Sequence, residues 1–177
     1  MARRTAAVCA LGLVTLLAAV GCGRSDSASD ARIADCGSAQ LSWKMTLRPG
    51  TPRHTPTATL SAAHKGSTPC AFDGYPRLSV SVGKGPSADS RPQRRTPVHL
   101  LLKPGHSIAI PVFYDAVGSP SGSCQVMAEY DPRVEVRPPH PGAHDYGSRV
   151  PLTDARGQHR RAQVCDSDML LGAPELH

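Results

Sequence analysis

Histidine and cysteine are the residue types in this 177-residue chain that could bind a metal or carry redox chemistry, and it has eight histidines and six cysteines. No two cysteines have the C-x-x-C spacing of a redox or zinc site. His140 and His144, followed by Asp145, have a ligand-like spacing, but Pro141 and Gly142 between them exclude a helix with both histidines on one face. We therefore predict surface histidines, no metal site and no cofactor. Capture of a metal or small ligand by this loop stays the alternative.

The serines and carboxylates do not form a catalytic pattern. Ser119 and Ser121 lie in a Gly-Ser-Pro-Ser-Gly sequence, which lacks the G-x-S-x-G order and the strand-to-helix context of a hydrolase elbow. Asp166 and Asp168 stand near the end of an expected strand, where a capping or solubilising role is expected. We therefore predict that the protein is not an enzyme. A surface hydrolase is the less favoured alternative, because it would need a serine or carboxylate to meet a histidine in a pocket.

Residues 1–21 have the pattern of a bacterial export signal. Arg3 and Arg4 precede an apolar run, Ala6 to Val20, which is shorter than the roughly 20 residues of a membrane span. The run ends in Leu-Ala-Ala-Val-Gly-Cys22, which resembles a lipobox, where the cysteine receives the lipid and becomes the mature N-terminus. We predict a palmitate-bearing anchor at Cys22 that holds the protein on the outer face of the cell membrane. Cleavage near Gly23, giving a secreted protein, and an uncleaved anchor are the alternatives.

Four cysteines remain once Cys9 leaves with the signal peptide and Cys22 carries the lipid. They are Cys36, Cys70, Cys124 and Cys165. Four cysteines in an exported domain most simply form two disulfides, for which three connectivities are open. We favour Cys70–Cys124 within the domain and Cys36–Cys165 joining its two ends.

The rest of the chain divides into three parts. Residues 22–35 are rich in Ser, Ala and Asp without an apolar period, so we expect a disordered tether. Residues 36–171 are expected to form one folded domain, and residues 172–177 a tail. Removal of the signal peptide lowers the formal charge from +6 to +4, because it removes two arginines and no acid.

Basic residues cluster at 91–95 and at 156–161. We expect solvated loops there, and an anionic partner such as a phospholipid or a cell-wall polymer is the alternative. Nucleic acid is not an expected partner, because the protein is exported and no aromatic residues interleave with the basic ones.

Seventeen prolines and sixteen glycines favour short strands joined by turns. The clearest strand is 41–47, where Leu41, Trp43, Met45 and Leu47 alternate with polar residues, and Trp43 is expected in the core. Further strands are expected at 55–63, 68–72, 78–82, 98–102, 108–114, 124–130 and 161–165. About seven short strands with regular turns predict an all-β, antiparallel sandwich of the immunoglobulin-like type. A closed barrel is the rival architecture.

A set of small motifs resembles a known family. The set comprises Gly66-x-x-Pro69-Cys70, then Gly74-Tyr75-Pro76, a Leu-x-Pro104-Gly105 turn, Cys124 and Cys165. Together they resemble an uncharacterised family of exported bacterial domains, domain-of-unknown-function family 4232. The resemblance implies an export or lipoprotein signal, a tether and one all-β domain, and it implies no catalytic residue.

These observations predict an uncharacterised exported lipoprotein that serves as a non-catalytic interaction module of the cell envelope. Its partner would be a protein or a cell-wall polymer. Loops at one end of such a domain usually carry the binding surface, and the candidates are residues 83–97 and 138–147.

Overall fold

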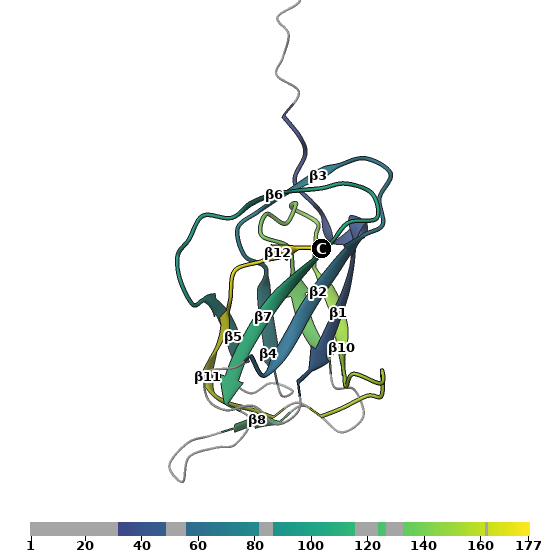
Figure 1. Ribbon diagram of the computed structural model, residues 1–177. Coiled ribbons are helices and arrows are strands. Elements are labelled where there is room, and N and C mark those ends of the chain that lie inside the picture. Colours follow the sequence, from purple (N-terminus) through teal and green to yellow (C-terminus); the bar gives the residue numbers. More distant parts are fainter. Residues whose placement is uncertain (1–31, 49–55, 82–86, 116–123, 127–132, 162) are drawn as a thin grey trace, which may run out of the picture. The chain divides into compact units, whose positions relative to one another are not determined.

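A computed structural model describes residues 32–48, 56–81, 87–115, 124–126, 133–161 and 163–177. The signal peptide, Cys22, most of the tether, Ser119 and Ser121 lie outside these residues. Residues Ile33–His177 form a compact unit (Figure 1). Its elements are the 3₁₀ helix η1 (Ser38–Gln40) and the strands β1 (Leu41–Leu47), β2 (Ala58–His64), β3 (Cys70–Asp73), β4 (Arg77–Ser81), β5 (Ser87–Pro92), β6 (His99–Leu102), β7 (Ser107–Asp115), β8 (Cys124–Val126), β9 (Arg133–Arg137), β10 (Ser148–Thr153), β11 (Gln163–Leu171) and β12 (Glu175–Leu176). Within the described residues, no helix is long and apolar enough to cross a membrane.

The prediction of an immunoglobulin-like sandwich is wrong, because eight strands close into a barrel. Their order is β7-β2-β1-β10-β9-β4-β5-β11, and β11 pairs back onto β7. The ladder is therefore continuous around the sheet, whereas a sandwich consists of two separate sheets with open edges. Closure depends on β9 and β10, which fill the gap between β1 and β4.

Two of the barrel pairings are parallel, namely β1 with β10 and β5 with β11. Each joins strands far apart in the sequence, with Met45 opposite Leu152 and Asp168 opposite Asp89. A parallel pair needs a long crossover connection and cannot be a simple hairpin. The barrel is therefore closed by long-range pairings, which the hydrophobic period of any single strand cannot specify.

The barrel interior is filled by one side chain in every two along each strand, as the pleat of a strand requires. In β7 the inward residues are Ile108, Ile110, Val112 and Tyr114, all buried. Trp43 is partly buried and packs against the core, with its ring centroid 6.3 Å from that of Phe72. The contact agrees with the prediction of Trp43 as a packing residue.

A small sheet of β3 and β6 lies at one end of the barrel and β8 lies at the other (Figure 1). Two disulfides are present, as predicted, but the favoured pairing is wrong: the bonds are Cys36–Cys70 and Cys124–Cys165. Asp35 forms a bridge with Ala71 of β3, which brings Cys36 beside Cys70. Cys124 and Cys165 are direct cross-strand partners in β8 and β11. Each disulfide therefore fastens a local pairing, and neither joins the two ends of the domain.

Several segments differ from their predicted structure. The expected loop 83–97 contains β5. No strand was expected at β9 or at β10, and both are strands of the barrel. The expected tail contains β12, which pairs with β7. The last residues of the expected tether also belong to the fold, because the carbonyl of Ala34 accepts a hydrogen bond from the Ala71 N–H.

Digestion of the non-reduced protein should yield peptides that join Cys36 to Cys70 and Cys124 to Cys165. The double variant Cys36→Ala/Cys70→Ala should lose about 3 to 4 kcal/mol of unfolding free energy, because the bond closes a loop with a sequence separation of 34. Peptide mass spectrometry tests the cysteine pairing, and urea denaturation tests the loss of unfolding free energy. A peptide that joins Cys70 to Cys124 would contradict the pairing seen here.

Gly147 and Gly105 offer a matched pair of substitutions. Both have positive φ, 82° and 81°, where an alanine costs about 1 kcal/mol. A Cβ atom at Gly147 would also lie 2.6 Å from the Val136 carbonyl oxygen, whereas none of the described atoms lies within 4 Å of one at Gly105. We expect Gly147→Ala to cost about 3 kcal/mol and Gly105→Ala about 1 kcal/mol in urea denaturation. Equal losses would show that the contact with Val136 does not matter.

Candidate functional site

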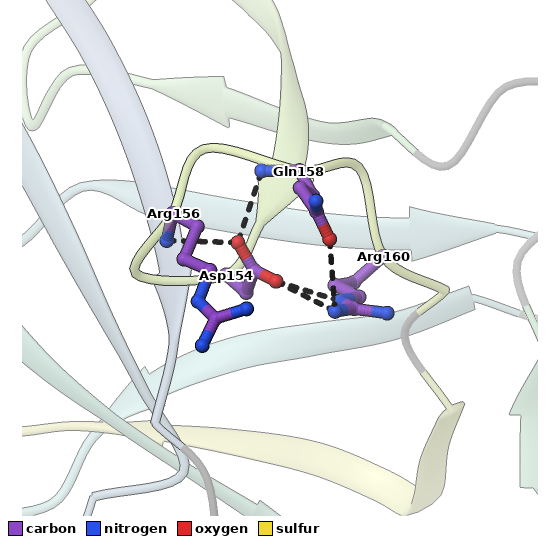
Figure 2. Close-up of polar contacts among 4 residues, drawn as sticks. All are labelled: Asp154, Arg156, Gln158 and Arg160. Atoms are coloured by element: carbon purple, nitrogen blue, oxygen red, sulfur yellow. Dashed lines mark hydrogen bonds and ion pairs between the residues drawn. The ribbon is translucent and has the colours of Figure 1, made fainter.

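A tight turn follows β10 and is organised by one carboxylate. The Oδ1 atom of Asp154 accepts hydrogen bonds from the backbone N–H groups of Arg156 and Gln158, both at 2.9 Å. Its Oδ2 atom accepts from Nε and Nη2 of Arg160 at 2.9 and 2.7 Å. Figure 2 shows that the carboxylate lies inside the turn and faces these donors. Gly157, with φ of 77°, supplies the left-handed residue that the turn needs.

These donors also set the charge of Asp154. The hydrogen bond from the Gln158 backbone and the side-chain hydrogen bond from Arg160 lower the pKa of the Asp154 carboxyl below 3.8. The carboxylate therefore stays ionised at neutral and moderately acidic pH. Arg160 also donates to the Gln158 amide oxygen at 3.2 Å. Its contacts with Asp154 and Gln158 together hold the guanidinium group in one orientation.

The turn forms one wall of a pocket of about 590 Å³, which we call the arginine pocket. Its lining residues come from the ends of β1 and β7, the residues before β2, and the segment from β10 to β11. They are Leu47, Arg48, Thr57, Tyr114, Asp154, Ala155, Arg156, Arg160, Arg161 and Gln163. Four arginines and one aspartate give this lining a formal charge of +3.

The strand pairings explain why these distant residues meet. Because β1 and β10 are parallel and Thr46 lies opposite Thr153, the residues that follow both strands emerge at the same end of the barrel. Arg48 follows β1 there, and the Asp154 turn follows β10. β2 begins and β7 ends at this end too, since Ala58 pairs with Leu47 and with Val112.

The apolar part of the lining comes from Leu47, Ala155 and Tyr114. Tyr114 is 9% exposed, and burial raises the pKa of its phenol to about 12. Tyr114 is therefore a neutral phenol at physiological pH. Its backbone is fastened to Thr57, whose hydroxyl donates to the Tyr114 carbonyl at 2.8 Å.

The arginines of the pocket differ in how many hydrogen bonds their guanidinium groups make to the described residues. Arg48 donates from Nε to the Thr59 hydroxyl at 2.8 Å, which leaves both terminal nitrogens free of partners in the described part of the chain. Arg156 contributes to the turn network through its backbone nitrogen, as Figure 2 shows, and its guanidinium contacts no partner among the described residues. The pocket therefore combines one arginine fixed by Asp154 with two whose guanidinium groups can bind a ligand. Such an arrangement suits an anion, because guanidinium forks bind planar or tetrahedral oxyanions.

The two histidines of the histidine motif lie at the surface, and the aspartate that follows them makes hydrogen bonds within the domain. His140 and His144 are exposed, and Asp145 accepts hydrogen bonds from the backbone N–H groups of Ser38 at 2.7 Å and Gly147 at 2.9 Å. Burial raises the pKa of Asp145, but the hydrogen bonds from Ser38 and Gly147 outweigh it, so the net pKa is lowered. The carboxylate therefore fastens the 138–147 segment to the start of the domain. The described residues contain no group of three or more His, Cys, Asp or Glu side chains that could hold a metal.

The two basic clusters are not brought together in one site. Arg91 in β5 forms an ion pair with Asp168 in β11 at 2.9 Å, and Arg94 and Arg95 are exposed after β5. None of the three lines the arginine pocket, whereas Arg156, Arg160 and Arg161 of the second cluster do. The sequence thus indicated three of the pocket's four arginines. It gave no sign of Arg48, Thr57 or Tyr114, because only the parallel pairing of β1 with β10 places them beside the second cluster.

The architecture defines a class: a disulfide-bonded, closed β-barrel domain with its arginine pocket among the loops at one end. Residues 36–168 match the family described as "Domain of unknown function (DUF4232)", and the chain belongs to this family. The resemblance predicted from the Pro-Cys and Gly-Tyr-Pro motifs is thereby confirmed. Comparisons with curated proteins and with solved structures gave no match.

The turn network should titrate with Asp154. Because the folded pKa is lowered, its contribution to stability is fully present above 3.8 and is lost as pH falls through the lower folded value. We expect the amide proton shifts of Arg156 and Gln158, followed by NMR, to titrate with a midpoint below 3.8. Asp154→Asn keeps an acceptor and removes the charge, so its shifts should stay flat. A wild-type midpoint at or above 3.8 would contradict the assigned hydrogen bonds.

Proposed function

We propose that this protein is an exported, lipid-anchored, non-catalytic binding module of the bacterial cell envelope. We further propose that it binds through the barrel end that holds the arginine pocket. The arginine pocket is the observation that carries the binding role. It is concave, has an apolar part, and displays the guanidinium groups of Arg48 and Arg156, whose terminal nitrogens have no partner among the described residues.

Two features support export and anchoring. The sequence has a lipobox-like end to its apolar run at Cys22, and its composition predicts a tether over residues 22–35. The four cysteines of that unit form two disulfides, which persist in oxidising compartments outside the cytosol. A protein or a cell-wall polymer remains the proposed partner class at the envelope.

The anchor can be tested with two cysteines of the same leader region. The full chain should partition into the membrane fraction of a bacterial host and incorporate an alkyne-labelled palmitate. Cys22→Ala should abolish the label and release the protein from that fraction, since the thiol that carries the lipid is gone.

Cys9→Ala is the matched control, because Cys9 lies within the apolar run and is expected to leave with the signal peptide. This variant should keep the label and the membrane location. Labelled, membrane-bound Cys22→Ala protein would show that the anchor is not at Cys22. A wild-type chain that is unlabelled and found in the medium would instead favour the secreted alternative.

A further inference from the structure

We infer that the arginine pocket binds an organic phosphate, that is, a phosphate monoester attached to an apolar body. The inference rests on the proposed function in one respect, because it takes this pocket as the binding face, and it assigns the pocket to a small ligand, which is the alternative partner class of the sequence analysis. It assigns a ligand chemistry to a site that sequence motifs alone did not show.

The charge of the lining favours an anion of more than one unit charge. Arg48 and Arg156 alone contribute two positive charges to the lining, and their terminal nitrogens have no partner in the described part of the chain. A phosphate monoester carries a charge of about −1.5 to −2 at pH 7 and offers three acceptor oxygens, so it can accept from two guanidinium groups at once. A carboxylate carries one charge, so it would leave one of the two positive charges uncompensated.

Asp154 gives two arginines of the pocket different roles, because it binds the guanidinium of Arg160 but only the backbone of Arg156. It binds Arg160 by two contacts and holds the turn through the backbone of Arg156. Its charge is therefore already compensated by Arg160, and the backbone bond to Arg156 fixes where that residue's side chain leaves the turn. The ligand meets a preset loop instead of one that must order on binding, which limits the entropy that binding costs.

The remaining lining indicates that the ligand is more than a bare ion. The pocket of about 590 Å³ has room for a small organic molecule, within the roughly 300 to 1,000 Å³ of ligand sites. Leu47, Ala155 and the neutral ring of Tyr114 can contact an apolar body beside the arginines. Because Tyr114 remains a neutral phenol, it does not repel the phosphate.

Calorimetric titration of the full-length product, as the cell processes it and with disulfides intact, tests the assignment with four probes. If anchored, the protein is held in phosphatidylcholine nanodiscs. The probes are hexyl phosphate, inorganic phosphate, hexanoate and hexanol. Hexyl phosphate should bind at least tenfold more tightly than each of the other three, because only it combines the phosphate with an apolar chain. Equal binding of hexanoate, or no binding of hexyl phosphate, would overturn the inference.

Arg156→Gln and Arg149→Gln separate a specific site from general attraction. Each variant removes one positive charge, but Arg149 lies in β10 outside the pocket lining. Arg156→Gln should weaken hexyl phosphate binding by about tenfold or more, whereas Arg149→Gln should leave it within about twofold. The thermal midpoint should change little in either, because neither guanidinium has a partner among the described residues. Equal weakening by both variants would show non-specific attraction and overturn the site.

The same assay distinguishes a lipid headgroup from a soluble phosphate. If the membrane supplies the ligand, nanodiscs that contain phosphatidic acid should weaken hexyl phosphate binding by competition, whereas nanodiscs of equal charge made with oleate should not. If the ligand is soluble, both nanodiscs should have the same effect. Palmitate labelling tests the anchor independently, so failure of hexyl phosphate binding with a labelled Cys22 would overturn the ligand inference and leave export in place.

Discussion

The closure of the barrel depends on β11. This nine-residue strand pairs with β8 near its start, with β5 along its second half, and with β7 on both sides of a register shift between Cys165 and Leu170. A shift of this kind bends a strand and increases its twist, which lets one strand complete a curved sheet. Without β11, β5 and the second half of β7 would be open edges with unpaired backbone groups, because β12 covers only the first half of β7. The bond from Cys165 to Cys124 holds the first part of this strand to β8.

The same closure positions the pocket. In a closed barrel the direction of each strand decides at which end its following loop emerges. The parallel pairing of β1 with β10 sends Arg48 and the Asp154 turn to one end, where the beginning of β2 and the end of β7 supply Thr57 and Tyr114. Backbone pairing in the barrel wall therefore determines which charges meet in the pocket. The long segments between them need no interaction of their own to bring those charges together.

Sequence reasoning worked best where a strand has its own hydrophobic period. β1 was predicted with its observed bounds and β7 within one residue at each end, because an apolar residue recurs at every second position in both. β5 was missed because its sequence, Ser-Ala-Asp-Ser-Arg-Pro, has one buried apolar residue, Ala88, and a terminal proline. Its strand state comes from pairing with β4 and β11. The choice between sandwich and barrel depended on such pairings, and so did the disulfide connectivity, since the bridge of Asp35 with Ala71 has no sequence signature.

The core of this domain and its proposed binding residues lie in different parts of the fold. The core consists of inward side chains of the barrel strands and the small β3–β6 sheet, and the disulfides join segments that already pair. The guanidinium groups of Arg48 and Arg156 lie on exposed residues that follow β1 and β10, where a change of side chain removes no core contact. Tyr114 and Leu47 are the exceptions, because Tyr114 belongs to the core cluster, Leu47 packs against it, and both line the pocket. Loops on a rigid scaffold can change their ligand without rebuilding the fold. In this chain, therefore, Tyr114 ties the apolar side of the pocket to the barrel core, while the charged side is set by the exposed residues that follow β1 and β10.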